Sequence, residues 1–140
     1  MKLVMQAVEV MTFLQEVFPQ LEGSFSIEHL ANGGITAQMS VGQQHLRPGG
    51  TVSGPTLFAL ADFTVYALVL AHVGPKALAV TTNATIDFMR KPEAGKDIVA
   101  EGKLLKLGRT LAVGDVLIYS KGMDKPVARS SMTYSLPPKS

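Results

Sequence analysis

The chain has no cysteine and no tryptophan among its 140 residues. The lack of cysteine excludes a disulfide framework, a thiolate metal site and a cysteine nucleophile. Its lysines and arginines form no run and the net charge is only +2, so the composition does not favour nucleic-acid binding. Charged residues make up only 17% of the chain, against 46% hydrophobic residues. We therefore expect an ample core and some apolar surface that is buried against a second copy of the chain.

The N-terminus shows no signal-peptide pattern, because Glu9 interrupts its short apolar stretch. A longer apolar stretch, residues 52–73, has the length of a membrane span. Asp62 lies near its middle, where a charge costs about 2.5–3.5 kcal/mol on insertion scales. The remaining segments alternate as the strands of a soluble sheet do. We therefore expect a cytoplasmic protein that does not enter the membrane.

Periodicity and turn residues predict one α+β domain over residues 1–140, with no repeat or linker. Apolar side chains recur at helical spacing from Leu3 to Phe18, and Pro19 ends the pattern. An N-terminal helix is therefore expected within residues 1–19.

A long central helix is expected over residues 53–73, with the sequence SGPTLFALADFTVYALVLAHV. Ser53 is a suitable N-cap, and Pro55 fits the first turn, where its missing N–H costs nothing. Gly74 and Pro75 follow the end of the pattern. Because the segment is apolar on nearly every side, we expect a sheet to wrap around it.

Six strands are predicted from short apolar or alternating runs separated by turn residues. The first two are joined by Ala-Asn-Gly-Gly, a hairpin signal, and the last four follow the long helix at even spacing. Consecutive strands with short turns predict an antiparallel sheet. The expected strands cover residues 24–30, 35–41, 77–89, 98–107, 110–120 and 127–136.

Asp62 is the only formally charged residue of the long helix. Burying an ionised carboxylate without partners costs several kcal/mol, and perturbed carboxylates in clefts often belong to active sites. The alternative is that Asp62 lies on a narrow solvated stripe or caps a neighbouring backbone N–H. We favour a functional carboxylate.

Gly54 offers a backbone N–H at the start of this helix, where the helix dipole favours a developing negative charge. A glycine-rich loop that only turns the chain is the alternative. Gly54 and Asp62 are eight residues apart, so about 12 Å along one helix. One carbonyl cannot lie within about 3 Å of both. If both act on one substrate, they come from two helices of a two-fold homodimer.

The segments RPGGTVSGPTLFALAD and VTTNATIDFMRKPEAGKDIVAEGKLLKLGRTLA, in this order of elements, resemble the hotdog-fold thioesterases. The nearest branch is similar to the phenylacetate-pathway enzymes, relatives of the 4-hydroxybenzoyl-CoA thioesterases. The resemblance extends from about residue 20 to the C-terminus. It implies an antiparallel sheet of about six strands wrapped around the central helix, and hydrolysis of an acyl-CoA thioester without a metal or cofactor.

The resemblance also implies roles for individual residues. Asp62 would act as general base or nucleophile, and the Gly54 N–H would polarise the thioester carbonyl from the opposing subunit. The small hydroxyl that follows the helix in this family falls on Thr81. Arg47 and Ser53 occupy the family's Asn and His positions, so either another side chain replaces the Asn or the chemistry is slower.

Asn83 is a candidate replacement, because strand alternation places it on the same face as Thr81. An ordinary cross-strand hydrogen bond is the alternative role for Asn83. Ser53 has neither a G-x-S-x-G elbow nor a marked His partner, so we expect an N-cap and not a nucleophile.

Basic residues near strand ends are candidate contacts for substrate phosphates. The resemblance assigns Arg90, Lys91 and Arg109 to coenzyme A, and Arg47 could bind a phosphate or carboxylate. Solvated turn charges are the alternative. The three histidines show no metal-ligand spacing, so no metal site is expected.

We therefore expect a homodimer, or a dimer of dimers, that hydrolyses an acyl-CoA, with coenzyme A entering only as part of the substrate. A non-catalytic acyl-CoA or acyl-lipid binding module is the alternative, suggested by the missing Asn and His. A hydratase would want a His near Asp62, and a purely structural dimer leaves this carboxylate unexplained. Phe58, Phe63 and Tyr66 could line an aromatic-sized acyl pocket or simply belong to the core.

Overall fold

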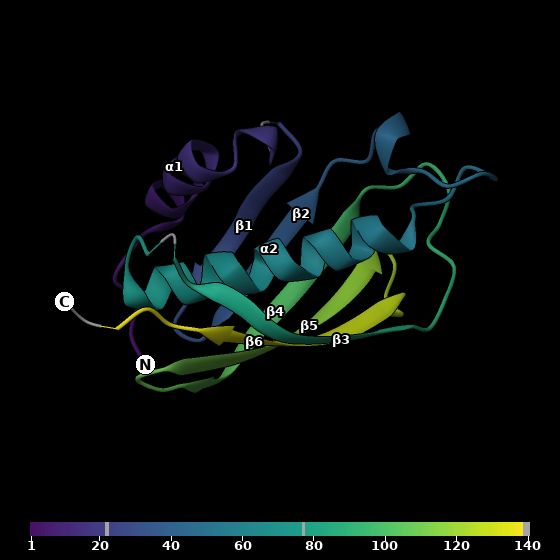
Figure 1. Cartoon of the computed structure of the whole chain (residues 1–140). Helices are drawn as coiled ribbons and strands as arrows, with labels where there is room; N and C mark the ends of the chain where they lie inside the picture. The colour runs from purple at the N-terminus through teal and green to yellow at the C-terminus, as the bar shows by residue number, and fades with distance from the viewer. Residues whose placement is uncertain (22, 77, 139–140) are drawn as a thin grey trace.

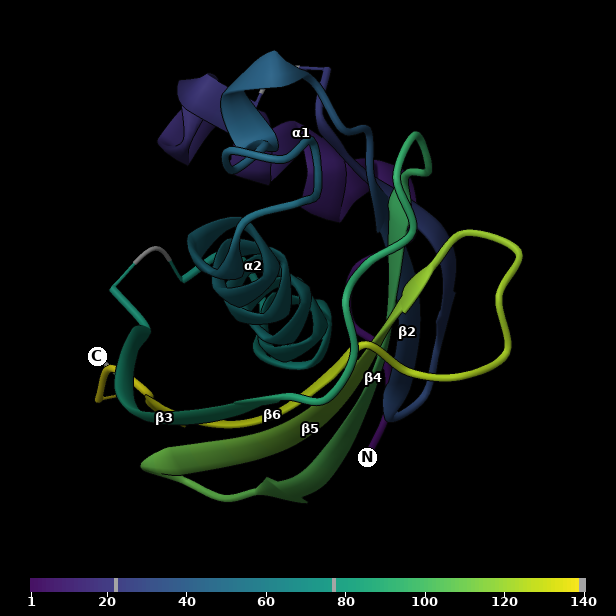
Figure 2. The same cartoon turned by 90° about the vertical axis from the view of Figure 1, so that its right-hand side faces the viewer.

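The computed structural model describes residues 1–21, 23–76 and 78–138. Its centre is one long helix, α2 (Gly54–Val73), around which a curved antiparallel sheet wraps (Figure 1, Figure 2). The order of strands in the sheet is β1-β2-β4-β5-β6-β3. The predicted α+β fold is therefore confirmed. The strands are β1 (Phe25–Ala31), β2 (Gly34–Met39), β3 (Val80–Phe88), β4 (Ile98–Leu107), β5 (Leu111–Ser120) and β6 (Ala128–Ser135).

Helix α2 is buried along most of its length because its sequence offers no polar face. Among the described residues it is the one helix long and apolar enough to cross a membrane, and 72% of its most apolar stretch is buried inside the domain. The Ser53 Oγ accepts the Thr56 N–H at 3.3 Å, which confirms the predicted N-cap. Gly74 ends the helix with a φ of 95°, which favours glycine.

The N-terminal helix is shorter than predicted. Helix α1 covers only Ala7–Val17, and α1 packs beside α2. The preceding residues bind other segments instead of continuing the helix: the Val4 N–H donates to the Ala71 oxygen at 2.7 Å. The Gln6 N–H donates to the Glu9 carboxylate at 2.9 Å, which caps the first turn. The first residues of the chain are therefore attached to the end of α2 by backbone hydrogen bonds, and they are not helical.

The six predicted strands all exist, and their ends differ by at most three residues from the predicted ones. The predicted start of the third strand, Ala77, lies outside the described residues, and β3 begins at Val80. Strand β3 is an edge of the sheet, because its only neighbour among the described residues is β6. Its other edge leaves backbone N–H and C=O groups without a strand partner.

A β-bulge in β3 overturns the prediction that Thr81 and Asn83 share a face. Thr81 pairs with Tyr134 and Asn83 with Thr133. An advance of two residues along β3 therefore matches an advance of one residue along β6. Thr82 is the extra residue. Thr81 is half-buried and faces α2, whereas Asn83 is exposed on the outer face of the sheet. Strand alternation failed here because the bulge inverts it.

Candidate active site

Asp62 lies halfway along α2 and is half-buried under β3 and β6. Its Oδ1 accepts two hydroxyl hydrogen bonds, from Thr81 at 2.7 Å and from Tyr134 at 2.5 Å. Thr81 and Tyr134 are paired across the two strands, so the sheet delivers both donors to one oxygen. Asp62 is therefore a held carboxylate and not an open surface charge.

The second oxygen of Asp62, Oδ2, accepts no hydrogen bond from the residues that the structure describes. No ion pair involves Asp62 within those residues either, since the one ion pair found there joins Arg129 and Asp87. The carboxylate therefore has one fixed oxygen and one available oxygen. An available carboxylate oxygen beside an apolar core can accept a proton from water or attack a carbonyl carbon.

Two stacked tyrosines flank this carboxylate. The rings of Tyr66 and Tyr134 are 5.8 Å apart and nearly parallel, and both residues are buried. Burial first, and the charge of Asp62 second, raise the pKa of Tyr134 above its ordinary value. Burial also raises the pKa of Tyr66, whose hydroxyl has no hydrogen-bond partner among the described residues. Both phenols therefore stay protonated in the neutral pH range.

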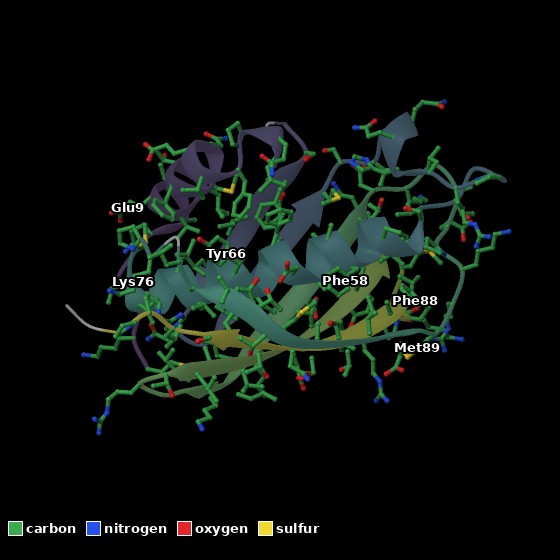
Figure 3. All side chains as sticks on the ribbon, in the orientation of Figure 1. Glu9, Phe58, Tyr66, Lys76, Phe88 and Met89 are labelled. Carbon is green, nitrogen blue, oxygen red and sulfur yellow. The ribbon has the colours of Figure 1, made fainter. Side chains whose placement is uncertain are left out.

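Phe18 and Phe63 extend the aromatic group on the side of α1. The Phe18 ring meets Phe63 and Tyr66 edge-on, with ring centroids 5.2 and 5.7 Å apart. Phe58 lies elsewhere on α2 and is 38% exposed. Figure 3 shows Phe58, Phe88 and Met89 toward the end where α2 begins, with Tyr66 nearer the other end. Phe63 and Tyr66 thus belong to the packed interior, and Phe58 faces outward.

Gly54 is the first residue of α2, beside the cap residue Ser53. The cap is occupied within the chain, because the Ser53 Oγ also lies 2.8 Å from the Thr56 hydroxyl. The Gly54 N–H donates to no acceptor within the described residues. A free N–H at a helix start is the donor geometry that a developing oxyanion requires.

A groove of about 720 Å³ opens at this end of α2. It brings together four of the residues predicted from the sequence, Arg47, Gly54, Arg90 and Lys91. The Arg90 guanidinium is partly fixed by donating to the Pro126 oxygen at 2.9 Å. Basic groups around a helix N-terminus make this groove suited to an anion such as a phosphate.

Arg109 and Asn83 do not join the groove. Arg109 lies in the turn between β4 and β5, two residues before Leu111, which pairs with the last residue of β6. The groove lies at the other end of β3, beyond Phe88. Asn83 points away from α2 because of the bulge. Neither residue therefore contacts Asp62 or Gly54 within one chain.

Two of the three histidines, His45 and His72, fill structural positions. His72 accepts the Gly33 N–H through Nε2 at 3.0 Å, and its Nδ1 lies 2.8 Å from the Leu68 oxygen. His45 accepts the Gly42 N–H through Nδ1 at 2.8 Å. No group of three or more His, Asp or Glu side chains within the described residues could hold a metal ion.

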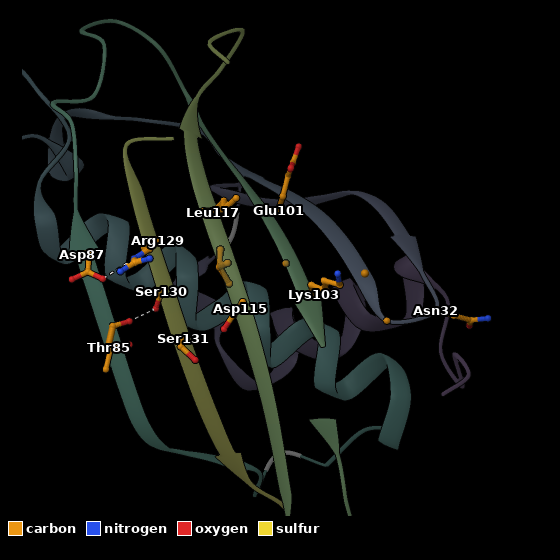
Figure 4. Close-up of a pocket in the computed structure, with 14 residues that line it drawn as sticks. Asn32, Thr85, Asp87, Glu101, Lys103, Asp115, Leu117, Arg129, Ser130 and Ser131 are labelled. Atoms are coloured by element: carbon orange, nitrogen blue, oxygen red, sulfur yellow. Dashed lines mark hydrogen bonds and ion pairs between the residues drawn. The ribbon is translucent and has the colours of Figure 1, made fainter. Parts of the chain in front are cut away.

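A second hollow, of about 890 Å³, lies on the outer face of the sheet (Figure 4). Acidic and basic side chains alternate there, and Arg129 forms an ion pair with Asp87 at 2.9 Å. Both of these side chains are mostly exposed to solvent. The sheet separates this hollow from Asp62, so it is not part of the same site.

Tyr134 was missed by the sequence analysis. Its neighbours on β6 alternate between buried and half-buried positions, and Tyr134 is at a buried one. A tyrosine among the inward residues of the last strand was a signal that a buried hydroxyl needed a partner. The strand pairing that brings Tyr134 to Asp62 could not be obtained from the sequence pattern alone.

The chain matches the family model described as "Thioesterase superfamily" over residues 49–127, which include α2, β3, β4 and β5. Acyl-coenzyme A thioesterase 13 of Homo sapiens is 29% identical over 120 residues, covering 85% of this chain and 84% of that protein. The crystal structure of a candidate thioesterase from Silicibacter sp. TM1040 is 64% identical, with a TM-score of 0.93, and covers 99% of this chain and 96% of that one. A mutant of the phenylacetic acid degradation protein PaaI from Thermus thermophilus is 28% identical, with a TM-score of 0.72, over 85% of this chain and 99% of that one. The chain therefore belongs to the thioesterase superfamily.

Proposed function

We propose that the chain hydrolyses acyl-CoA thioesters at a site shared between two subunits. The observation that carries this proposal is the carboxylate of Asp62, held by Oδ1 and available at Oδ2. The name of the human relative, an acyl-coenzyme A thioesterase, supports an acyl-CoA as the substrate. The groove with Arg47, Arg90 and Lys91 supports the phosphates of coenzyme A as its occupant.

The open edge of β3 supports a shared site. Two copies of β3 can pair in antiparallel fashion about its middle residue, Ala84, which places Val80 of one chain opposite Phe88 of the other. Thr81, next to Val80, holds Asp62, and Phe88 lies against Gly54. This pairing therefore brings the Asp62 of one subunit close to the Gly54 of its partner.

The same pairing would allow Asp62 and Gly54 to act on one substrate although they are far apart along α2. Within one chain Asp62 and Gly54 are eight residues apart, or about 12 Å along the helix. Across the dimer, the Gly54 N–H of one subunit stabilises the oxyanion that forms on the thioester carbonyl. Oδ2 of the other subunit's Asp62 takes a proton from the attacking water, or attacks the carbonyl carbon itself. The C–S bond then breaks, and the thiolate of coenzyme A leaves and is protonated. In the nucleophilic route the acyl group is then on Asp62 as a mixed anhydride, which water hydrolyses to release the free acid and restore the carboxylate.

This chemistry uses only side chains and a backbone N–H, so the proposal includes no metal and no cofactor. Coenzyme A enters as part of the substrate. The active unit is the homodimer, and a dimer of dimers would contain the same paired sites. The domain boundaries, residues 1–140, and the cytoplasmic location stay predictions.

Binding without hydrolysis is the second candidate function. It is favoured by Arg47 and Ser53, which stand where the resembling family has Asn and His. A binding module would hold an acyl-CoA in the same groove and release no thiol. The contacts of Asp62 favour hydrolysis, because simple binding of an acyl chain does not need a held carboxylate with one available oxygen.

A thiol-release assay over short, long and aryl acyl-CoAs tests the proposal. We expect release from at least one class, and a rate about 10²–10⁴-fold lower in Asp62→Asn, as for the loss of a general base. Asn keeps the shape of Asp and can still accept the Thr81 and Tyr134 hydroxyls. Asp87→Asn, which removes an exposed carboxylate on the outer face, is the control. Saturable binding without thiol release, or full activity of Asp62→Asn, would contradict the proposal.

A further inference from the structure

Tyr134 makes two contacts with one residue, Asp62. Its hydroxyl is 2.5 Å from Oδ1 and 3.0 Å from the backbone oxygen of Asp62. A phenol has a single proton, so both acceptors share one donor. Because one acceptor is on the side chain and the other on the backbone, Tyr134 fixes the carboxylate relative to α2. Thr81, which donates only to Oδ1, cannot do this.

The Tyr134 hydroxyl is a permanent donor. The residue is only 3% exposed, and its ring is stacked on Tyr66. Burial, and next the negative charge of Asp62, raise the pKa of Tyr134 from its ordinary value of 10.0. The phenol therefore keeps its proton throughout the acidic and neutral pH range. The Tyr134 hydroxyl therefore remains a donor to Oδ1 across this range.

We propose that Tyr134 is a positioning residue of the hydrolytic site, which holds Asp62 by Oδ1 so that Oδ2 alone meets the reacting water or thioester. This inference rests on the proposed function. Two hydroxyls occupy Oδ1, while Oδ2 receives no donor from the described residues. A freely turning carboxylate would exchange its two oxygens and lose alignment with the carbonyl of the substrate.

Removing the Tyr134 hydroxyl leaves Thr81 as the single donor to Oδ1. The link from Oδ1 through the phenol to the backbone oxygen of Asp62 is then lost, so the carboxylate can turn. The chemical step slows, because Oδ2 is less often aligned with the reacting water or thioester. A purely structural role of the ring would leave the kcat of the folded enzyme unchanged in Tyr134→Phe.

The test compares Tyr134→Phe with Tyr66→Phe. Both variants remove one hydroxyl from the same ring stack and keep both rings. The Tyr66 hydroxyl has no hydrogen-bond partner among the described residues. Tyr66→Phe therefore makes the same change in side-chain size as Tyr134→Phe and removes no hydrogen bond to Asp62. The measurement is kcat and KM, taken separately, with the acyl-CoA that the wild type cleaves best.

In Tyr134→Phe we expect kcat to fall roughly tenfold to hundredfold, as for a lost hydrogen bond to a charged group. The KM should change little, because the acyl-CoA groove is intact. Tyr66→Phe should keep the kcat and the KM of the wild type. Equal behaviour of the two variants, or a Tyr134→Phe enzyme that raises KM and keeps kcat, would overturn the inference.

Crystal structures of the two variants separate this inference from the proposed function. If the wild type and Asp62→Asn both release no thiol from any acyl-CoA, the proposed function fails. The position of the Asp62 carboxylate still decides the role of Tyr134. We expect the carboxylate to turn or become divided in Tyr134→Phe and to stay in place in Tyr66→Phe. A carboxylate that keeps its place in both would refute positioning by Tyr134.

Discussion

The ring of Phe88 lies directly over Gly54, so close that a Cβ on Gly54 would be 3.3 Å from the Phe88 Cζ. Phe88 is the last residue of β3, and Gly54 is the first of α2. A glycine at this position lets the strand end approach the helix start, and it leaves the backbone N–H uncovered by a side chain of its own. The close approach, and not a left-handed φ, is the reason for glycine here.

Replacing Gly54 by Pro or Ala tests the oxyanion donor. Gly54→Pro removes the N–H, whereas Gly54→Ala keeps it, and both add a Cβ against Phe88. We expect Gly54→Pro to have a kcat about 10²–10³-fold below that of Gly54→Ala, as for one lost oxyanion donor. The comparison is made on thiol release, with thermal unfolding as the check that both variants fold. Similar rates for the two variants would argue against an N–H that stabilises the oxyanion.

Subunit mixing tests the shared site. Chains carrying Asp62→Asn and chains carrying Gly54→Pro are each expected to be inactive as homodimers. After unfolding and refolding as an equal mixture, about half of the dimers are mixed, and each has one intact site of two. Activity should therefore recover to about one quarter of the wild type. The mixture would stay inactive if each site were built from a single chain.

Thr81 supplies the second donor to Oδ1 of Asp62, at 2.7 Å. Thr81→Val keeps the shape of the side chain and removes the hydroxyl, so we expect kcat to fall about tenfold. Thr82→Val is the matched control, because Thr82 is exposed and donates only to the Thr133 oxygen, at 3.3 Å. Rates are measured by thiol release. A Thr81→Val enzyme no slower than Thr82→Val would show that this donor has no part in the reaction.

Neutralising the groove should weaken binding and leave the chemical step intact. In Arg47→Gln and Lys91→Gln we expect KM for an acyl-CoA to rise severalfold. The kcat should stay unchanged, because phosphate contacts stabilise the bound substrate and the transition state equally. The effect should shrink at high salt. It should vanish with an acyl-pantetheine thioester, which has no phosphate. Arg109→Gln, at the other end of the sheet, serves for comparison. An equal rise of KM in Arg109→Gln would indicate that the phosphates bind outside the groove.

The buried tyrosines predict a loss of stability at high pH. Burial raises the pKa of Tyr134 in the folded state, whereas in the unfolded chain it ionises near its ordinary value of 10.0. Above pH 10 the unfolded state therefore holds fewer protons, and the free energy of unfolding falls by up to about 1.4 kcal/mol per pH unit. Tyr134→Phe removes this contribution. Urea unfolding between pH 8 and about 11 should show a shallower decline in the variant; equal slopes would contradict the prediction.

The long helix and the strands were predictable because each has a strong periodic pattern and clear end signals. Ser53, Pro55 and Gly74 mark the ends of α2, and all three occupy the expected positions. The first residues of the chain were mispredicted as helix, because their apolar spacing imitates a helical stripe while their backbone is hydrogen-bonded to the end of α2. A local pattern cannot distinguish these two origins of apolar spacing.

The candidate site was predictable where one residue is conspicuous by itself. Asp62 is the one charge in an apolar helix, and Gly54 marks the helix start. Asn83 was placed wrongly, because the bulge at Thr82 depends on pairing with β6. Tyr134 was missed for the same reason. It is 72 residues from Asp62 in the sequence, and the pairing of β6 with β3 brings its hydroxyl to the carboxylate.

The bulge at Thr82 also constrains how this strand can change in length. Deleting Thr82 would restore regular alternation and keep the faces on both sides, because Thr81 already pairs with Tyr134 and Asn83 with Thr133, the preceding residue of β6. Removing Asn83 as well would leave no extra residue: either Thr81 would turn its hydroxyl away from Asp62, or Ala84 and Ile86 would turn outward and bring Thr85 and Asp87 beneath the sheet. Thr82 is therefore a spare residue in the register: homologous chains can lose one residue here and keep the site, whereas a second loss would move site residues to the wrong face.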